Sequence, residues 1–319
     1  MTHVASGTKA HPAPPVKGRF APSPTGRMHA GNIFSALLAW LIAKSQGGSI
    51  VLRIEDLDKE RSKPHFIDAV QRDFETLGLF WDEGPYYQHD RDEAYAEAFD
   101  SLAKRGLIYP CFCTRADLHA ASAPHHGEKL VYPGSCRALG PDEQARRAAR
   151  RAPAQRLVVP DEDIEFTDAI QGAYRQNLAT ECGDFLVRRS DGAFAYQLAV
   201  VVDDAAQGIT SVVRGVDLLC STPQQMHLQN LLGFDHPAYA HVPLIVSAHD
   251  RRLSKRDHDA AIDALLARFG SPEAVIGHIA GTTGIAQTCD PATPEELLEG
   301  FDMRALPERL RDLEQIRWR

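Results

Sequence analysis

Short apolar runs alternate with stretches of helical periodicity along the chain from Gly18 onward. Residues 18–21 and 50–54 are apolar runs of the kind that forms buried strands. Between them, apolar positions recur at helical spacing over about residues 31–44. A strand, a helix and a second strand in this order form a βαβ unit, in which the two strands run parallel. We therefore expect a parallel sheet close to the N-terminus.

The same alternation continues beyond this first unit. Residues 64–77 and 92–105 have helical patterns, and Gly78 and Gly106 follow them at positions that suit a C-terminal cap. Four later apolar runs predict strands, over residues 184–188, 199–203, 209–214 and 241–246.

The last part of the chain favours helices. Residues 221–232 predict a helix with Ser221 as its N-cap and Pro223 in its first turn. Everything after Asp257 has helical patterns that Gly and Pro interrupt. The predicted fold class is therefore α/β, with a Rossmann-like parallel sheet followed by a small helical domain.

Composition shifts divide the chain into five expected segments. Residues 111–140 are rich in Cys, His, Pro and Gly and lack periodicity, which indicates a module inserted into the sheet domain. The segments are a disordered leader (1–17), the first half of the catalytic domain (18–110), the inserted module (111–182), the second half of the catalytic domain (183–256) and the helical domain (257–319).

Composition and charge limit the class of protein. The chain has 319 residues, of which 44% are hydrophobic and 24% charged, as in a soluble globular protein. It contains neither a membrane-length apolar run nor the apolar core of a secretory signal. Its six cysteines do not form the pattern of a disulfide framework, so we expect a protein of the reducing cytosol.

The formal net charge of −8 argues only weakly against a nucleic-acid partner, because a local basic face can hold RNA on an acidic protein. Arginines and lysines gather at residues 146–151, 188–189 and 251–256. These clusters are candidates for such a face, and solvated surface is the alternative for each of them.

Two separated motifs indicate a nucleotide site. In Arg19-Phe-Ala-Pro-Ser-Pro-Thr-Gly-Arg-Met-His-Ala-Gly-Asn32 a predicted strand ends in a turn and a helix begins near His29. The N–H groups at a helix N-terminus bind phosphates, and Gly31 lets a nucleotide approach the backbone. The second motif, Arg252-Leu-Ser-Lys-Arg256, follows a predicted strand and could place the Lys255 ammonium on a triphosphate.

This pair of motifs resembles the HIGH and KMSKS motifs of class I aminoacyl-tRNA synthetases. The segments Val51-Leu-Arg-Ile-Glu-Asp-Leu-Asp58 and Trp81-Asp-Glu-Gly-Pro-Tyr-Tyr-Gln88 make the resemblance specific to the glutamyl branch, over about residues 18–255. Asn32 replaces the second histidine of the first motif, and Arg252 replaces the first lysine of the second. The resemblance implies ATP as substrate, with Mg²⁺, and assigns ATP binding to His29, Gly31, Asn32 and Lys255, of which His29 and Lys255 are catalytic.

A pocket for glutamate needs cations for two carboxylates and an anion for the ammonium group. Arg19 and Arg214 could supply the cations, and Glu55 follows the second strand at the carboxyl edge where α/β sheets bind ligands. For Glu55 alone a surface ion pair is the alternative, and for Tyr196 alone core packing. The resemblance implies that the glutamate site comprises Arg19, Phe20, Ala21, Pro22, Ser23, Glu55, Tyr196 and Arg214.

Three cysteines within the expected insertion suggest a structural zinc site. Cys111, Cys113 and Cys136 offer three thiolates, one fewer than a tetrahedral zinc site needs. Resemblance to glutamyl relatives implies that Tyr132, in Tyr-Pro-Gly-Ser-Cys136, is the fourth ligand of a single zinc ion. The alternatives for the fourth ligand are His119, His125 and His126, and three ordinary buried cysteines remain the alternative to a metal site.

Only a short helical segment follows the second motif, whereas ordinary glutamyl-tRNA synthetases continue into an anticodon-binding portion. In this respect the chain resembles the glutamyl-Q tRNA(Asp) synthetases, which place glutamate on queuosine at the wobble position of tRNA(Asp). That resemblance implies a cytosolic protein, expected to be a monomer, whose residues 257–319 contact the tRNA stem. The alternatives are a truncated glutamyl-tRNA synthetase that charges the 3′ end, a glutamate-activating ligase with another acceptor, and a non-catalytic tRNA-binding paralogue.

Overall fold

The predicted βαβ unit is present in the computed structural model, which describes residues 15–114, 117, 131–246 and 261–318. Strand β1 (Lys17–Phe20), helix α1 (Ala30–Lys44) and strand β2 (Ser49–Ile54) follow one another. β1 and β2 pair in parallel, with Arg19 opposite Val51. Strand β3 (Glu83–Tyr87) pairs in parallel with the other edge of β2.

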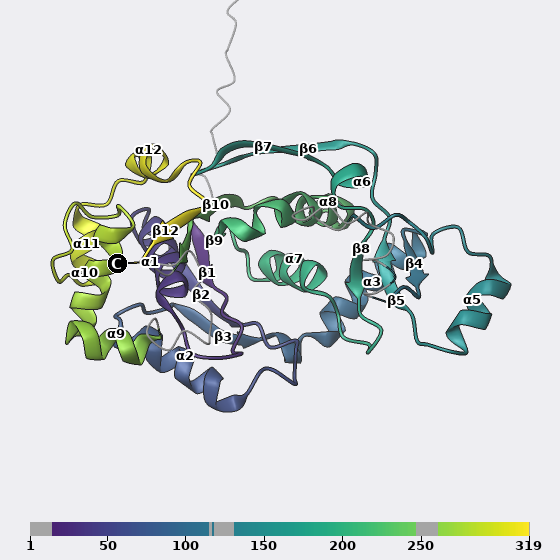
Figure 1. Cartoon of the computed structure of the whole chain (residues 1–319), viewed down its shortest axis with the longest axis horizontal. Coiled ribbons are helices and arrows are strands. Elements are labelled where there is room, and N and C mark those ends of the chain that lie inside the picture. Colours follow the sequence, from purple (N-terminus) through teal and green to yellow (C-terminus); the bar gives the residue numbers. More distant parts are fainter. Residues whose placement is uncertain (1–14, 115–116, 118–130, 247–260, 319) are drawn as a thin grey trace, which may run out of the picture.

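A second parallel pair extends this sheet. Strands β9 (Ser211–Gly215) and β10 (Ala238–Val242) pair in parallel. The Thr210 backbone N–H donates to the Lys17 carbonyl at 2.9 Å, and the Lys17 N–H donates to the Thr210 side-chain oxygen at 2.8 Å. The five strands therefore lie in the order β3-β2-β1-β9-β10, and α1 packs against both parts (Figure 1).

Helix α1 is the centre of the main hydrophobic core. Its sequence is apolar almost all round, and eleven of its fifteen residues are buried. A helix of this kind needs partners on every side. It finds them in the parallel strands and in helices α10 (Pro272–Thr282) and α11 (Pro294–Glu299).

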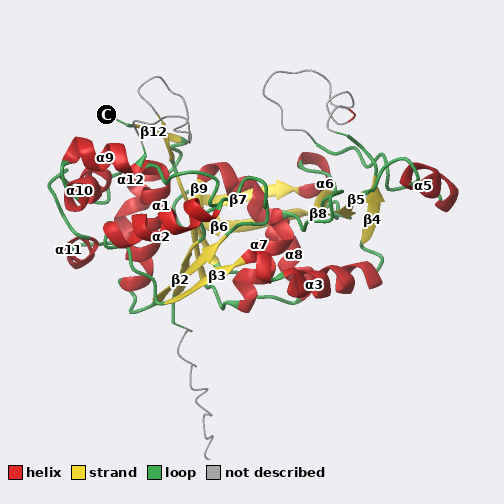
Figure 2. Ribbon diagram, turned by 90° about the horizontal axis from the view of Figure 1, so that it is seen from below, coloured by secondary structure: helices red, strands yellow, loops and turns green. Residues whose placement is uncertain are grey.

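The remaining elements lie on either side of the parallel sheet (Figure 2). Beyond one end, β4 (Ile108–Cys111), β5 (Ala154–Leu157) and β8 (Phe185–Arg188) form an antiparallel sheet. The other helices and strands of the described residues are α2 (Pro64–Thr76), α3 (Asp92–Lys104), α5 (Pro141–Ala148), β6 (Asp163–Asp168), β7 (Gly172–Asn177), α6 (Leu178–Glu181), α7 (Tyr196–Ala206), α8 (Thr222–Leu232), β11 (Leu244–Val246), α9 (Ile262–Phe269), α12 (Leu306–Leu310) and β12 (Gln315–Arg317), with 3₁₀ turns at Gln88–Asp90, Val216–Ser221 and Met303–Ala305.

Most of the expected elements are confirmed. The helices predicted over residues 64–77 and 92–105 are α2 and α3, and the glycines after them have the left-handed backbone of a C-terminal cap, with φ of 71° at Gly78 and 70° at Gly106. The strands predicted over residues 184–188 and 209–214 are β8 and β9. Several helices follow residue 261, as expected.

Two predictions are wrong, and a third is confirmed in part. Residues 199–203 are not a strand but the middle of helix α7, whose residues 198–204 are all buried. A helix buried on all sides has no polar face, so a short apolar run cannot distinguish it from a buried strand. Residues 241–246 belong to two strands, because Pro243 lacks the N–H that would continue the ladder. Ser221 is the N-cap residue of α8 and Pro223 lies in the first turn, as predicted, but the Ser221 side chain makes no cap hydrogen bond, since the residue ends a 3₁₀ turn that leads directly into α8.

No helix among the described residues is long and apolar enough to span a membrane.

Candidate active site

A cavity of about 560 Å³ opens at the carboxyl ends of β1, β2 and β9. Ligands bind at this edge in open α/β sheets. The cavity is lined by every residue that the sequence analysis assigned to ATP or glutamate and that the structure describes: Arg19, Phe20, Ala21, Pro22, Ser23, His29, Gly31, Asn32, Glu55, Tyr196 and Arg214. Lys255 lies outside the described residues.

The first motif forms the N-terminus of α1. His29 occupies the N-cap position, and its backbone N–H donates to the Asn32 Oδ1 atom at 3.2 Å. Asn32 thus acts as a helix cap, a role that a histidine would not reproduce in the same way. A Cβ atom on Gly31 would lie 3.2 Å from two atoms of the His29 ring. Gly31 therefore leaves space for the ring at the cavity wall.

The second motif lies outside the described residues, but the described segments that precede and follow it in sequence both approach the first motif or the cavity. Ile245, in β11, lines the cavity, and Ala261 pairs with His29 through a backbone bridge. The Ile262 N–H also donates to the Met28 carbonyl at 3.2 Å. The described neighbours on both sides of Arg252–Arg256 are therefore beside the first motif.

A buried ion-pair network lies behind the cavity. The Arg53 side chain is fully buried and donates to Asp204 and Gln207 at 2.8 Å and to Glu55 at 3.3 Å. Burial opposes its charge, but the carboxylates of Asp204, Glu55 and Asp203 raise the pKa of Arg53 above its usual value. Arg53 therefore stays charged and holds three carboxylates together.

Two adjacent carboxylates on α7 complete this network, and sequence reasoning missed them. Asp204 also lies 3.5 Å from the Arg19 Nε atom. Asp203 accepts hydrogen bonds from Arg91 at 2.7 Å and Tyr95 at 2.8 Å. Two aspartates directly after an apolar run are the available signal, but a run of this length predicts a strand, in which the two side chains would point to opposite faces.

Glu55 and Tyr196 bring a carboxyl group and a phenol hydroxyl to the cavity. Burial raises the pKa of the Glu55 carboxyl, although Arg53 and Arg19 oppose the shift. Burial and the neighbouring Glu55 charge raise the pKa of the Tyr196 hydroxyl. Asp217 and Thr25 also line the cavity, although the sequence analysis did not select them.

Arg214 also lines the cavity and is a buried cation whose partners among the described residues are neutral. Its Nε atom donates to the His241 Nε2 atom at 3.0 Å. Its Nη1 and Nη2 atoms donate to Gln225 and Thr222, both at 2.8 Å. No carboxylate of the described residues forms an ion pair with it. Since a guanidinium carries five N–H groups, two remain for an anion in the cavity.

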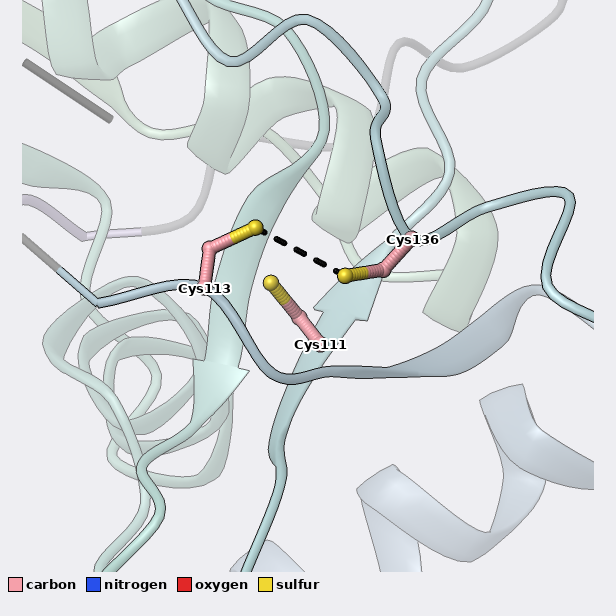
Figure 3. A group of neighbouring side chains, drawn as sticks. All are labelled: Cys111, Cys113 and Cys136. Carbon is pink, nitrogen blue, oxygen red and sulfur yellow. Dashed lines mark hydrogen bonds between the residues drawn. The ribbon is translucent and has the colours of Figure 1, made fainter. Parts of the chain in front are cut away.

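The three cysteines of the predicted metal site converge far from this cavity. Figure 3 shows the Cys111, Cys113 and Cys136 side chains pointing toward one another. Their sulfur atoms lie within 4.8 Å of one another, and those of Cys113 and Cys136 are 3.6 Å apart. Three sulfur donors at this spacing fit the chemistry of a zinc site.

Tyr132 stands next to the cysteines, as the sequence analysis expected. Its hydroxyl lies 3.5 Å from the Cys111 sulfur and accepts the Cys136 backbone N–H at 3.0 Å. The Arg156 guanidinium lies 3.6 Å above the Tyr132 ring and donates to the Cys111 sulfur at 3.2 Å. His119, His125 and His126, the alternative ligands, lie outside the described residues.

Comparison with known proteins identifies similar chains. Residues 15–302 match the family model for the catalytic domain of class I tRNA synthetases (E and Q). A glutamyl-Q tRNA(Asp) synthetase of Symbiobacterium thermophilum is 47% identical over 91% of this chain and 93% of that protein. A glutamyl-Q tRNA(Asp) synthetase of Nitratidesulfovibrio vulgaris is 44% identical over 92% of this chain and 94% of that protein. A glutamate tRNA ligase of Elizabethkingia meningosepticum, crystallised with its amino acid, has a TM-score of 0.79 and 26% identity over 96% of this chain and 67% of that one.

Proposed function

The chain belongs to the class I tRNA synthetases of the E and Q type, and we propose that it activates L-glutamate with ATP and transfers it to queuosine at the wobble position of tRNA(Asp). The acceptor follows from the names of relatives that are 44–47% identical over more than nine-tenths of the chain. The observation that carries the activation step is a cavity lined both by Arg214, a buried arginine with no carboxylate partner among the described residues, and by the carboxylate of Glu55.

In this proposal the charges of glutamate match those of the cavity. Arg214 and Arg19 bind its two carboxylates, because guanidinium groups form paired hydrogen bonds with carboxylates. Glu55 and the Tyr196 hydroxyl receive the ammonium group. A cation in the cavity also favours the ionised form of Glu55, which burial alone disfavours.

ATP occupies the N-terminal end of α1. Phosphate oxygens accept from the backbone N–H groups there, and the partial positive charge of the helix adds to the attraction. His29 donates to the phosphates, and Gly31 leaves room for the close approach of the nucleotide. Lys255 supplies a further positive charge on the triphosphate, and Mg²⁺ neutralises phosphate charge when it is bound.

The reaction needs no nucleophile from the protein. A glutamate α-carboxylate oxygen attacks the α-phosphorus of ATP, the bond to the β-phosphate oxygen breaks, and pyrophosphate leaves. A hydroxyl of the queuosine cyclopentenediol then attacks the carbonyl carbon of glutamyl-adenylate, loses its proton, and AMP leaves. The residues contribute positioning and charge stabilisation, which can account for a large part of such a rate acceleration.

Transfer of labelled glutamate to two tRNA pools tests the acceptor. One pool comes from cells that make queuosine and the other from matched cells that lack it. We expect ATP-dependent labelling of tRNA(Asp) in the first pool only, because only that pool carries the cyclopentenediol. Equal labelling of tRNA(Glu) in both pools would instead establish charging of the 3′ end. Glutamate activation without labelling of either pool would favour a ligase with another acceptor.

We further propose that Cys111, Cys113, Cys136 and Tyr132 hold one structural zinc ion. The sulfur distances support this, and so does the position of the Tyr132 hydroxyl beside Cys111. These residues and their neighbours form only a small buried cluster, so a metal would stabilise a region with little core of its own.

Metal analysis tests the zinc site. We expect about one zinc per chain in the purified protein, and less than about a fifth of that in Cys113→Ser, because removing one thiolate from a zinc site weakens binding by orders of magnitude. Cys289→Ser is the matched control, since Cys289 is exposed and apart from the cluster. Full zinc content in Cys113→Ser, or none in the wild type, would rule the site out.

A further inference from the structure

A chain of buried polar groups leads from the β6–β7 hairpin to the cavity. Asp168 ends β6, His241 lies in β10, and Arg214 lies in β9. His241 is 0% exposed and Asp168 1%. Of the three, only Arg214 lines the cavity, so Asp168 and His241 can affect a ligand there only through Arg214.

Asp168 acts entirely as an acceptor. Its Oδ1 atom accepts the backbone N–H groups of Ile170 and Gln171 at 2.9 Å and of His241 at 3.1 Å. Its Oδ2 atom lies 2.6 Å from the His241 Nδ1 atom. Although burial alone would raise it, these hydrogen bonds and the imidazole hold the pKa of Asp168 below its usual value. Because the carboxylate has no proton to donate, the His241 Nδ1 atom must carry one.

The opposite side of the imidazole ring has to accept. The Arg214 Nε–H group is always a donor, and it lies 3.0 Å from the His241 Nε2 atom. A proton on that nitrogen would place two donors against each other, whereas a lone pair there can also accept from the Thr222 hydroxyl, whose oxygen lies 3.3 Å away. Burial also lowers the pKa of His241, which favours the neutral ring. The ring is therefore neutral, with its proton on Nδ1 and its lone pair on Nε2.

We propose that Asp168 and His241 are positioning residues, with Asp168 fixing the tautomer whose lone pair aims the Arg214 guanidinium into the cavity. Thr222 and Gln225 hold the two Nη atoms, so all three nitrogens are fixed and the plane of the group is set. Its two remaining N–H groups then meet a substrate carboxylate in one orientation. The consequence for glutamate rests on the proposed function, whereas the tautomer itself does not.

Asp168→Asn tests the proposal with an isosteric change. The Asn carbonyl oxygen can keep the three backbone hydrogen bonds, while its amide donates to His241 Nδ1 and moves the ring proton to Nε2. That proton would oppose Arg214. We expect the KM for glutamate in pyrophosphate exchange to rise about 10- to 100-fold, as one lost or opposed buried hydrogen bond would cause. The kcat and the KM for ATP should change less than about threefold, because Asp168 touches neither substrate.

The tautomer of His241 can be measured by a method that does not depend on enzyme activity. Nitrogen-15 NMR of labelled histidine should show a protonated Nδ1 for His241 in the wild type and a protonated Nε2 in Asp168→Asn. Asp163→Asn is the matched control, because Asp163 begins the same strand, is exposed and pairs only with Arg175 among the described residues. An unchanged tautomer or an unchanged KM for glutamate in Asp168→Asn would overturn the proposal.

A pair of His241 variants tests whether His241 positions Arg214. This test remains available if Asp168→Asn fails to fold. In His241→Gln the side-chain oxygen can take the place of Nε2 and accept from Arg214. In His241→Asn the shorter amide can reach only Asp168. We expect a lower KM for glutamate in the Gln variant, and equal values would overturn the proposal. If wild-type protein shows no glutamate-dependent exchange, the proposed function fails, and the NMR result alone decides the tautomer.

Discussion

Replacing Arg214 with alanine should reduce kcat/KM for glutamate in pyrophosphate exchange by about 10²- to 10³-fold. Arg214 is the cavity cation whose partners, His241, Thr222 and Gln225, are all neutral. Loss of a buried, hydrogen-bonded charge pair at a binding site costs about 2–5 kcal/mol, and a 10²- to 10³-fold reduction lies in the middle of that range. The loss should fall mainly on the KM for glutamate, while the KM for ATP stays close to the wild-type value.

Two further variants test whether the charge or the hydrogen-bond geometry of Arg214 accounts for this loss. Arg214→Lys keeps the positive charge but not the planar fork, so we expect it to recover only part of the lost affinity. Arg304→Ala is the control, because Arg304 is exposed, pairs with Asp302 and is not among the residues that line the cavity. A wild-type KM for glutamate in Arg214→Ala would remove Arg214 from the binding site.

The elements that the sequence predicts well are those with a strong local signal. Helix α2 has a clear apolar stripe and a glycine at its end, and β1 and β2 are short apolar runs on either side of a helix. The run at residues 199–203 carries no such signal, because the helix that contains it is buried on every side. Tertiary packing, which the sequence pattern does not contain, decided between helix and strand there.

The same reason explains which parts of the site could be predicted. Arg19, His29 and Glu55 lie in motifs with a recognisable spacing, and all three line one cavity. The residues behind the cavity wall, Asp204 beside Arg19 and the Asp168–His241 pair beside Arg214, come from distant segments and have no motif in common. His241 and Asp168 are 73 residues apart in sequence and meet only because β6 ends beside β10. Their roles follow from three-dimensional contacts alone.

The largest effect on stability is expected for Arg53→Met. Arg53 is fully buried and is the shared partner of Glu55, Asp203 and Asp204. Methionine fills a similar volume but leaves these carboxylates with much less positive charge nearby. Breaking a buried ion pair by removing one partner costs about 3–5 kcal/mol, and we expect a loss of this size in the free energy of unfolding, measured by urea denaturation at neutral pH.

The pH dependence of that loss identifies its cause. Burial already raises the pKa of the Glu55 carboxyl while Arg53 opposes the shift, so without Arg53 its folded-state pKa lies further above the unfolded value. A raised folded-state pKa means that stability falls as the pH rises through it, so the Arg53→Met variant should regain stability as the pH is lowered from neutral. Arg175→Met, at an exposed ion pair with Asp163, should change the free energy of unfolding by less than about 0.5 kcal/mol. A deficit in Arg53→Met that is the same at every pH would show that packing, and not unpaired carboxylates, accounts for the loss.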